Sequence, residues 1–107
     1  MPGSAPPDKP MVNVTFHPAA SADYDDAHAW YAARDAAAAD GFEDAVRHAT
    51  GTLALLPEIG APVDSGHRIW PLGKYPYGLI YRIVGGDVLI VAVKHDRQRS
   101  GFWRRRT

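Results

Sequence analysis

The chain has 107 residues, enough for one folded domain, since a domain of this size buries roughly 60–70% of the surface that its unfolded chain exposes. It contains no cysteine, which excludes disulfides, thiolate metal sites and a cysteine nucleophile. The formal net charge at pH 7 is zero, but the charges are separated along the chain. Residues 21–58 hold eight acidic and two basic residues, whereas residues 67–107 hold nine basic and two acidic ones. We therefore expect an acidic and a basic end, able to orient a charged partner.

The N-terminal segment 1–10 contains four prolines and no apolar stretch, which argues against both a secretion signal and a folded element. We predict a disordered leader over residues 1–10, with Met1 or Met11 as the start, and a single domain over residues 11–107. The longest apolar run, Val88–Val93, is far shorter than the about 20 residues that a membrane helix needs. These features favour a cytoplasmic protein that does not enter a membrane.

Two helices are predicted after a first strand. The strand is indicated by Val12, Val14 and Phe16, which alternate with polar residues. Pro18 can open a helix, because a proline at the first helical position loses only a donor that had no partner. Apolar residues at helical spacing extend this helix to about Ala39; they are Ala20, Tyr24, Ala27 and Tyr31.

A second helix is predicted from the sequence Asp40-Gly-Phe-Glu43, which reads as a capping box, to Pro57, which stops it. Its apolar stripe has the spacing of one helix face and is formed by Phe42, Ala45, Val46, Ala49, Leu53 and Leu56. The two helices should form an antiparallel hairpin. Leu53 and Leu56 are expected to face a sheet.

The remainder of the chain predicts that sheet. Residues 59–66 are rich in Gly and Pro and are expected to form a loop, and Arg68–Leu72 a short strand with Pro71 at an edge or strand end. Tyr77–Val84 and Asp87–His95 should form a hairpin around Gly85-Gly86, since glycines accept the positive φ of a type I′ turn. The predicted fold is therefore α+β, in the order β-α-α-β-β-β, with the helical hairpin packed on a small antiparallel sheet.

This order of motifs resembles the RelE/ParE superfamily of bacterial toxins. The resemblance rests on the stretch Leu53-Ala-Leu-Leu-Pro57-Glu-Ile-Gly60, the strand Tyr77-Gly-Leu-Ile-Tyr81-Arg82, the strand end Val93-Lys94-His95-Asp-Arg97, and the tail Arg99-Ser-Gly-Phe-Trp103-Arg-Arg-Arg106. It covers Val12 to Arg106. It implies the toxin of a type II toxin–antitoxin pair, neutralised by a cognate antitoxin protein in a hetero-oligomer, without a cofactor.

Members of this superfamily act in one of two ways. ParE-type toxins inhibit DNA gyrase by protein contact, whereas RelE-type toxins cut messenger RNA on the ribosome. Gly78 stands where the RelE pattern has an arginine, and Trp103 where it has a tail tyrosine; neither can transfer a proton. The zero net charge also disfavours a nuclease that enters the ribosome. We therefore expect a ParE-like gyrase inhibitor, with a RelE-type endoribonuclease as the alternative.

The candidate site lies in the basic tail. The expected target-binding residues are Arg97, Arg99, Trp103, Arg104, Arg105 and Arg106. A nuclease would instead use His95 as base and Arg97 and Arg99 as a phosphate clamp, although His95 can equally be structural. Phe102 and Trp103 can pack on the domain or a partner, or stack on a base, so a simple nucleic-acid-binding module is a weaker third hypothesis. The remaining histidines lack metal-ligand spacing, and no metal is expected.

Overall fold

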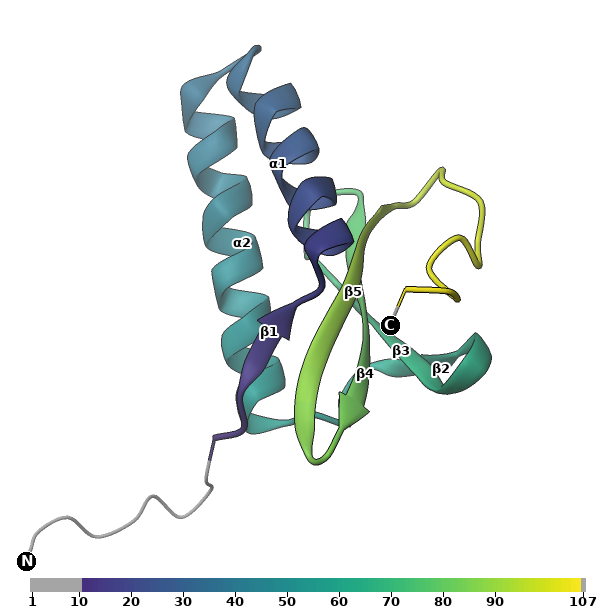
Figure 1. The fold of residues 1–107 in the computed structure, drawn as a ribbon. Coiled ribbons are helices and arrows are strands. Elements are labelled where there is room, and N and C mark those ends of the chain that lie inside the picture. The colour runs from purple at the N-terminus through teal and green to yellow at the C-terminus, as the bar shows by residue number, and fades with distance from the viewer. Residues whose placement is uncertain (1–10, 107) are drawn as a thin grey trace, which may run out of the picture.

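The computed structural model describes residues 11–106, which form one five-stranded sheet with two helices on one face (Figure 1). The expectation of a disordered leader therefore concerns residues outside the described part of the chain. The elements in chain order are β1 Val14–Phe16, α1 Pro18–Ala32, α2 Ala36–Leu55, β2 Ala61–Val63, η1 Asp64–Gly66, β3 His67–Pro71, β4 Tyr77–Val84 and β5 Asp87–His95. The strand order across the sheet is β1-β5-β4-β3-β2. The predicted α+β class and element order are confirmed.

The β4–β5 hairpin has the predicted boundaries. Gly85 and Gly86 both have positive φ, at +59° and +87°, as a type I′ turn requires. The register shifts between Ile80, which pairs with Ala92, and Tyr81, which pairs with Ile90. One extra residue therefore bulges from β5 in the middle of the sheet.

The sheet is mixed, because β1 pairs with β5 in parallel, with Val14 opposite Val88. A purely antiparallel sheet was expected. That expectation came from the hairpin, whose short turn allows only antiparallel pairing, whereas strands far apart in sequence can pair in either direction.

The helices meet earlier than predicted. The predicted boundary near Ala39 and Asp40 is wrong: α1 ends at Ala32, and α2 begins at Ala36. Asp35 has extended backbone angles, and its Oδ1 accepts a hydrogen bond from the backbone N–H of Ala37 at 3.0 Å, so it is the N-cap. Asp40 lies inside α2. The alanines between the two aspartates favour helix strongly enough to make the earlier cap the effective one.

The predicted loop 59–66 contains a strand and a turn. β2 pairs antiparallel with β3 at one edge of the sheet, and Pro62 lies in the middle of it. Proline is tolerated there because an edge strand has one side on which no backbone donor is needed. β3 begins and ends one residue before the predicted Arg68–Leu72; it is an inner strand, and Pro71 lies at its end, one of the two positions predicted for it.

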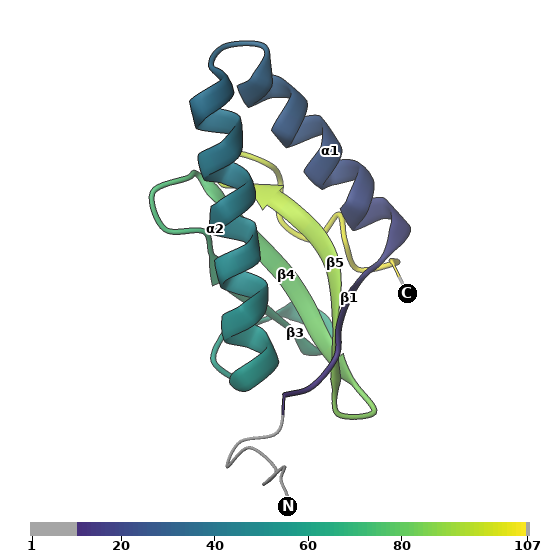
Figure 2. The ribbon, with the colours of Figure 1, turned by 90° about the vertical axis from the view of Figure 1, so that its left-hand side faces the viewer.

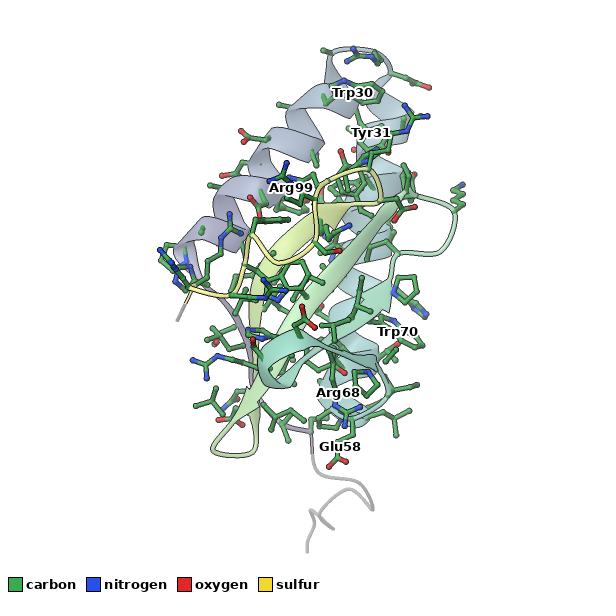
Figure 3. All side chains as sticks on the ribbon, turned by 90° about the vertical axis from the view of Figure 1, so that its right-hand side faces the viewer. Trp30, Tyr31, Glu58, Arg68, Trp70 and Arg99 are labelled. Atoms are coloured by element: carbon green, nitrogen blue, oxygen red, sulfur yellow. The ribbon has the colours of Figure 1, made fainter. Side chains whose placement is uncertain are left out.

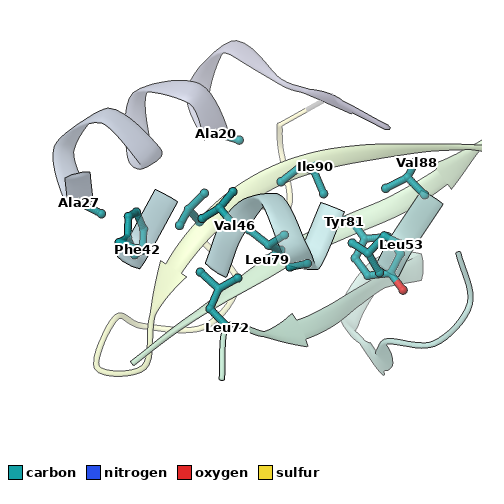
Figure 4. Packing of buried hydrophobic residues seen from close by; sticks show 12 residues of the cluster. Ala20, Ala27, Phe42, Val46, Leu53, Leu72, Leu79, Tyr81, Val88 and Ile90 are labelled. Carbon is teal, nitrogen blue, oxygen red and sulfur yellow. The ribbon is translucent and has the colours of Figure 1, made fainter. Parts of the chain in front are cut away.

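The main core lies between the helices and the sheet. Figure 2 shows α1 and α2 in front of β4 and β5, and Figure 4 shows the side chains packed between them. Phe42 and Leu53 of α2 are completely buried there. Leu56, which was also predicted to face the sheet, is 43% exposed because α2 has already ended at Leu55.

One buried hydroxyl joins the helical hairpin to the sheet. The Tyr81 hydroxyl on β4 donates to the carbonyl oxygen of Pro57 at 2.7 Å and accepts from the backbone N–H of Gly60 at 2.9 Å. A Cβ atom on Gly60 would lie 2.6 Å from that hydroxyl and 2.8 Å from the carbonyl oxygen of Ile69, so only glycine fits. The proline and glycine of the Leu-x-x-x-Pro-x-x-Gly stretch thus meet the second tyrosine of the β4 motif.

Burial raises the pKa of four tyrosines above the ordinary value of 10.0; they are Tyr24, Tyr31, Tyr77 and Tyr81. Their folded-state pKa values exceed the unfolded ones, so the stabilisation is complete below about pH 10 and is lost as the pH rises further. We expect the free energy of unfolding, measured with urea, to fall between about pH 9 and pH 11. Tyr77→Phe should make that fall shallower, and an unchanged slope would contradict the assignment.

Candidate target-binding surface

The C-terminal segment 96–106, here called the tail, covers the face of the sheet that the helices leave open (Figures 1 and 3). Trp103 is only 3% exposed and packs in a second buried cluster with Ile80, Val91 and Ala92. Phe102 packs against the same cluster. Of the two roles that the sequence left open for this aromatic pair, the structure places both side chains against the domain, and the Trp103 ring presents almost no surface to a partner.

Two ion pairs hold the end of the tail. Arg106 Nη1 lies 2.6 Å from the Asp23 carboxylate on α1 and donates to the carbonyl oxygen of Val91 at 3.0 Å. The same Asp23 carboxylate accepts the backbone N–H of Val93 at 3.1 Å, so α1, β5 and the tail share one contact. Arg104 pairs with Asp64 of η1. The Arg106–Asp23 pair therefore joins the basic part of the chain to its acidic part within the molecule.

Three other arginines of the tail face solvent. Arg97, Arg99 and Arg105 are exposed and form no ion pair within residues 11–106 (Arg99 is labelled in Figure 3). A guanidinium without an internal partner remains available for a carboxylate or phosphate of another molecule. The six predicted target-binding residues thus divide into a buried anchor, two internally paired arginines and three free ones.

His95 lies at the end of β5, two residues before Arg97. Its Nδ1 lies 3.0 Å from the backbone N of Arg97, and its ring meets the Tyr77 ring edge-on with centroids 4.9 Å apart. It lines a pocket of about 270 Å³ with two carboxylates from α1. The lining residues are Asp23, Asp26, Ala27, Trp30, Tyr77, Val93, His95 and Gln98. Among the described residues, the lining includes no lysine or arginine, and its Asp23 carboxylate is paired with Arg106.

A larger apolar groove lies between α2 and the turn that follows β3, with a volume of about 700 Å³. Its lining comes from two distant parts of the chain: Gly41, Asp44, Ala45, His48, Ala49, Trp70, Pro71, Leu72, Gly73, Lys74 and Tyr75. Trp70 is labelled in Figure 3. The sequence analysis did not identify this groove, since neither segment alone carries a binding motif.

Other exposed apolar side chains come from the chain around the end of α2, from the β4–β5 tip and from the start of the described residues; they are Met11, Leu55, Leu56, Ile59, Ile83 and Val84. Such residues are common at protein interfaces when they form a patch. Neither helix is long and apolar enough to cross a membrane within the part of the chain described.

A helical hairpin on one face of a mixed sheet and a basic tail on the other are features of the RelE/ParE class of small toxins. A family model described as "ParE toxin of type II toxin-antitoxin system, parDE" matches residues 14–100. The chain belongs to this ParE toxin family, and it is therefore the toxin of a toxin–antitoxin pair.

The fold is also similar to a solved structure described as "Chromosomal ParDE TA system from P. aeruginosa". The TM-score is 0.60 at 20% sequence identity, over 79% of this chain and 96% of the other, so this likeness concerns the fold. No curated protein sequence matches the chain significantly.

Proposed function

We propose that this ParE-family toxin inhibits DNA gyrase by direct protein contact, made by the arginines of its tail. The observation that carries the proposal is that Arg97, Arg99 and Arg105 are exposed and have no internal ion-pair partner within the described chain, although neighbouring arginines of the same tail do. Interfaces concentrate binding energy in a few residues, with arginine prominent among them. The cytoplasm, where gyrase acts, is the corresponding location.

The geometry supports contact better than RNA cleavage. Cleavage needs a base, an acid and cations that converge on one phosphate. His95 instead shares its pocket with Asp23 and Asp26. Position 78 has little room for an arginine, since a Cβ atom there would lie 3.0 Å from Cδ1 and Cγ1 of Ile69. Trp103 is buried beneath the tail.

The test compares supercoiling by purified gyrase in the presence of the wild-type toxin and of Arg97→Ala or Arg99→Ala. If either arginine is a hot spot, its loss should cost about 1–4 kcal/mol, which raises the half-inhibitory concentration roughly 5-fold to 1,000-fold. Arg47→Ala is the matched control, because Arg47 is an exposed arginine on α2 whose pairs with Glu43 and Asp44 contribute little stability.

Primer extension on transcripts after toxin induction tests the RelE-type alternative. Under the proposal, messenger RNA on ribosomes stays intact. New cuts within codons that disappear with His95→Ala would identify a ribonuclease and overturn gyrase inhibition as the activity.

We further propose that the cognate antitoxin covers the apolar groove beside the helical hairpin or an edge of the sheet. A stable complex of this kind buries more than ~1,000 Å². The groove is lined mainly by apolar side chains, so the toxin alone should be less soluble than the complex. Because the antitoxin binds only the folded toxin, the toxin alone should also melt at a lower temperature. Thermal melts and light scattering measure both properties, and equal values with and without antitoxin would contradict this proposal.

A further inference from the structure

Two buried polar atoms, on neighbouring aromatic rings, have no hydrogen-bond partner in the described structure. They are Nε2 of His67 on β3 and Nε1 of Trp103. His67 is 5% exposed and Trp103 3% exposed, and their ring centroids lie 6.5 Å apart in an edge-on arrangement. Buried polar groups in native proteins almost always have partners, so this pair needs an explanation.

The two atoms are complementary as donor and acceptor. Nδ1 of His67 lies 3.1 Å from the carbonyl oxygen of Asp64, which can only accept. In the neutral ring this contact places the hydrogen on Nδ1 and leaves the lone pair on Nε2. The indole Nε1–H of Trp103 can only donate. The indole N–H of Trp103 is therefore a donor without an acceptor, and Nε2 of His67 is an acceptor without a donor.

We propose that His67 is the positioning residue of the tail: the Trp103 indole N–H donates, through one bridging water molecule, to Nε2 of His67. A bridge is needed because no direct hydrogen bond joins the two nitrogens. Such a water is enthalpically almost equivalent to a direct bond. We call this arrangement the His67–Trp103 latch.

The surrounding charges connect the latch to the rest of the tail. Asp64, whose carbonyl oxygen orients His67, holds Arg104 through its carboxylate. Arg68 pairs with Tyr81 in the antiparallel β3–β4 ladder. The next residues along these strands, His67 and Arg82, therefore lie opposite each other. The latch fixes the tail at Trp103, and His95 at the end of β5 fixes its beginning.

The segment between these two points carries Arg97 and Arg99. With the latch at one end and His95 at the other, the positions that these two guanidinium groups can occupy are limited. A preorganised contact binds more tightly than one that must be ordered on binding. The inference that the latch positions Arg97 and Arg99 for binding rests on the proposed function, whereas the latch itself does not.

The test replaces His67 in the full-length toxin and follows the indole N–H signals by NMR. Trp30 and Trp70 supply internal reference signals, and Trp103→Phe identifies the third. His67→Phe keeps a ring but removes the acceptor, so the Trp103 signal should move and its hydrogen exchange should accelerate about tenfold, while the other two signals stay. His67→Gln restores an acceptor near the position of Nε2 and should recover most of the protection.

His67→Asn is the second variant. Its amide is expected to reach Asp64 but not Trp103, so it should behave like His67→Phe and covers the case in which the phenylalanine variant does not fold. An unchanged Trp103 signal and exchange rate in either variant would overturn the latch, as would equal loss of protection in His67→Gln and His67→Asn.

Gyrase inhibition provides the separate functional measurement. His67→Phe should raise the half-inhibitory concentration, with rescue by His67→Gln. If the wild-type toxin does not inhibit gyrase while the indole signals respond as expected, the proposed target is wrong and the latch stands. If inhibition is unaffected by a variant that has lost indole protection, the latch does not position the arginines.

Discussion

Replacement of Leu53 by alanine should lower the free energy of unfolding by about 2–5 kcal/mol. Leu53 is completely buried between α2 and the sheet, in the same cluster as Tyr81 and Val88. The substitution removes apolar contacts and leaves a cavity that the surrounding β-sheet can close only partly. Toxicity should be lost because the protein unfolds, without a specific effect on the tail.

Urea unfolding monitored by circular dichroism measures this change. Leu55→Ala is the matched control, since Leu55 lies on the same helix but is 46% exposed, and it should change stability by no more than about 0.5 kcal/mol. Equal losses in the two variants would mean that the helix register is wrong.

Trp103→Ala should have a comparable effect on stability, about 3–5 kcal/mol, because its ring is the largest side chain between the tail and the sheet. The sequence predicted that Trp103 contacts the target. Its burial shows that it anchors the tail to the sheet. Without the ring, the tail should detach and expose Ile80, Val91 and Ala92 to solvent.

Thermal melting and limited trypsin digestion together measure this result. The arginines of the tail should be cleaved faster in Trp103→Ala than in the wild type, and Trp103→Phe should be intermediate. A variant that keeps its melting temperature and its protease resistance, yet fails to inhibit gyrase, would show instead that Trp103 contacts the target directly.

Sequence reasoning succeeded where one local signal dominated. The paired glycines 85 and 86 allow a turn that most residues disfavour, so both strands of the hairpin had the predicted limits. The boundary between the helices was predicted from the capping box at Asp40, whereas the structure uses Asp35 as the N-cap. A capping box is a local signal, whereas the cap that forms also depends on the helix propensity of the residues before that box, here the alanines at 36–39.

The candidate site was predictable in composition but not in arrangement. The arginine-rich tail is visible in the sequence, and the motif order led to the correct toxin family. Nothing in the sequence distinguishes Arg106, which pairs with Asp23, from Arg105, which does not. Pairing of charges so far apart along the chain depends on tertiary packing, and the same holds for the apolar groove formed by residues 41–49 and 70–75.

The position of β5 determines when the toxin can exist as a folded molecule during its own synthesis. β5 lies between β1 and β4, and Trp103 completes the cluster on the far face of the sheet. A chain made from its N-terminus therefore produces β1 and both helices before the strand that joins them to the sheet. Such long-range pairing folds late, because contacts distant in sequence must wait for their partners. Arg97 and Arg99 become part of a fixed surface only when Trp103 is in place, so a growing chain on the ribosome does not yet carry the finished toxin surface.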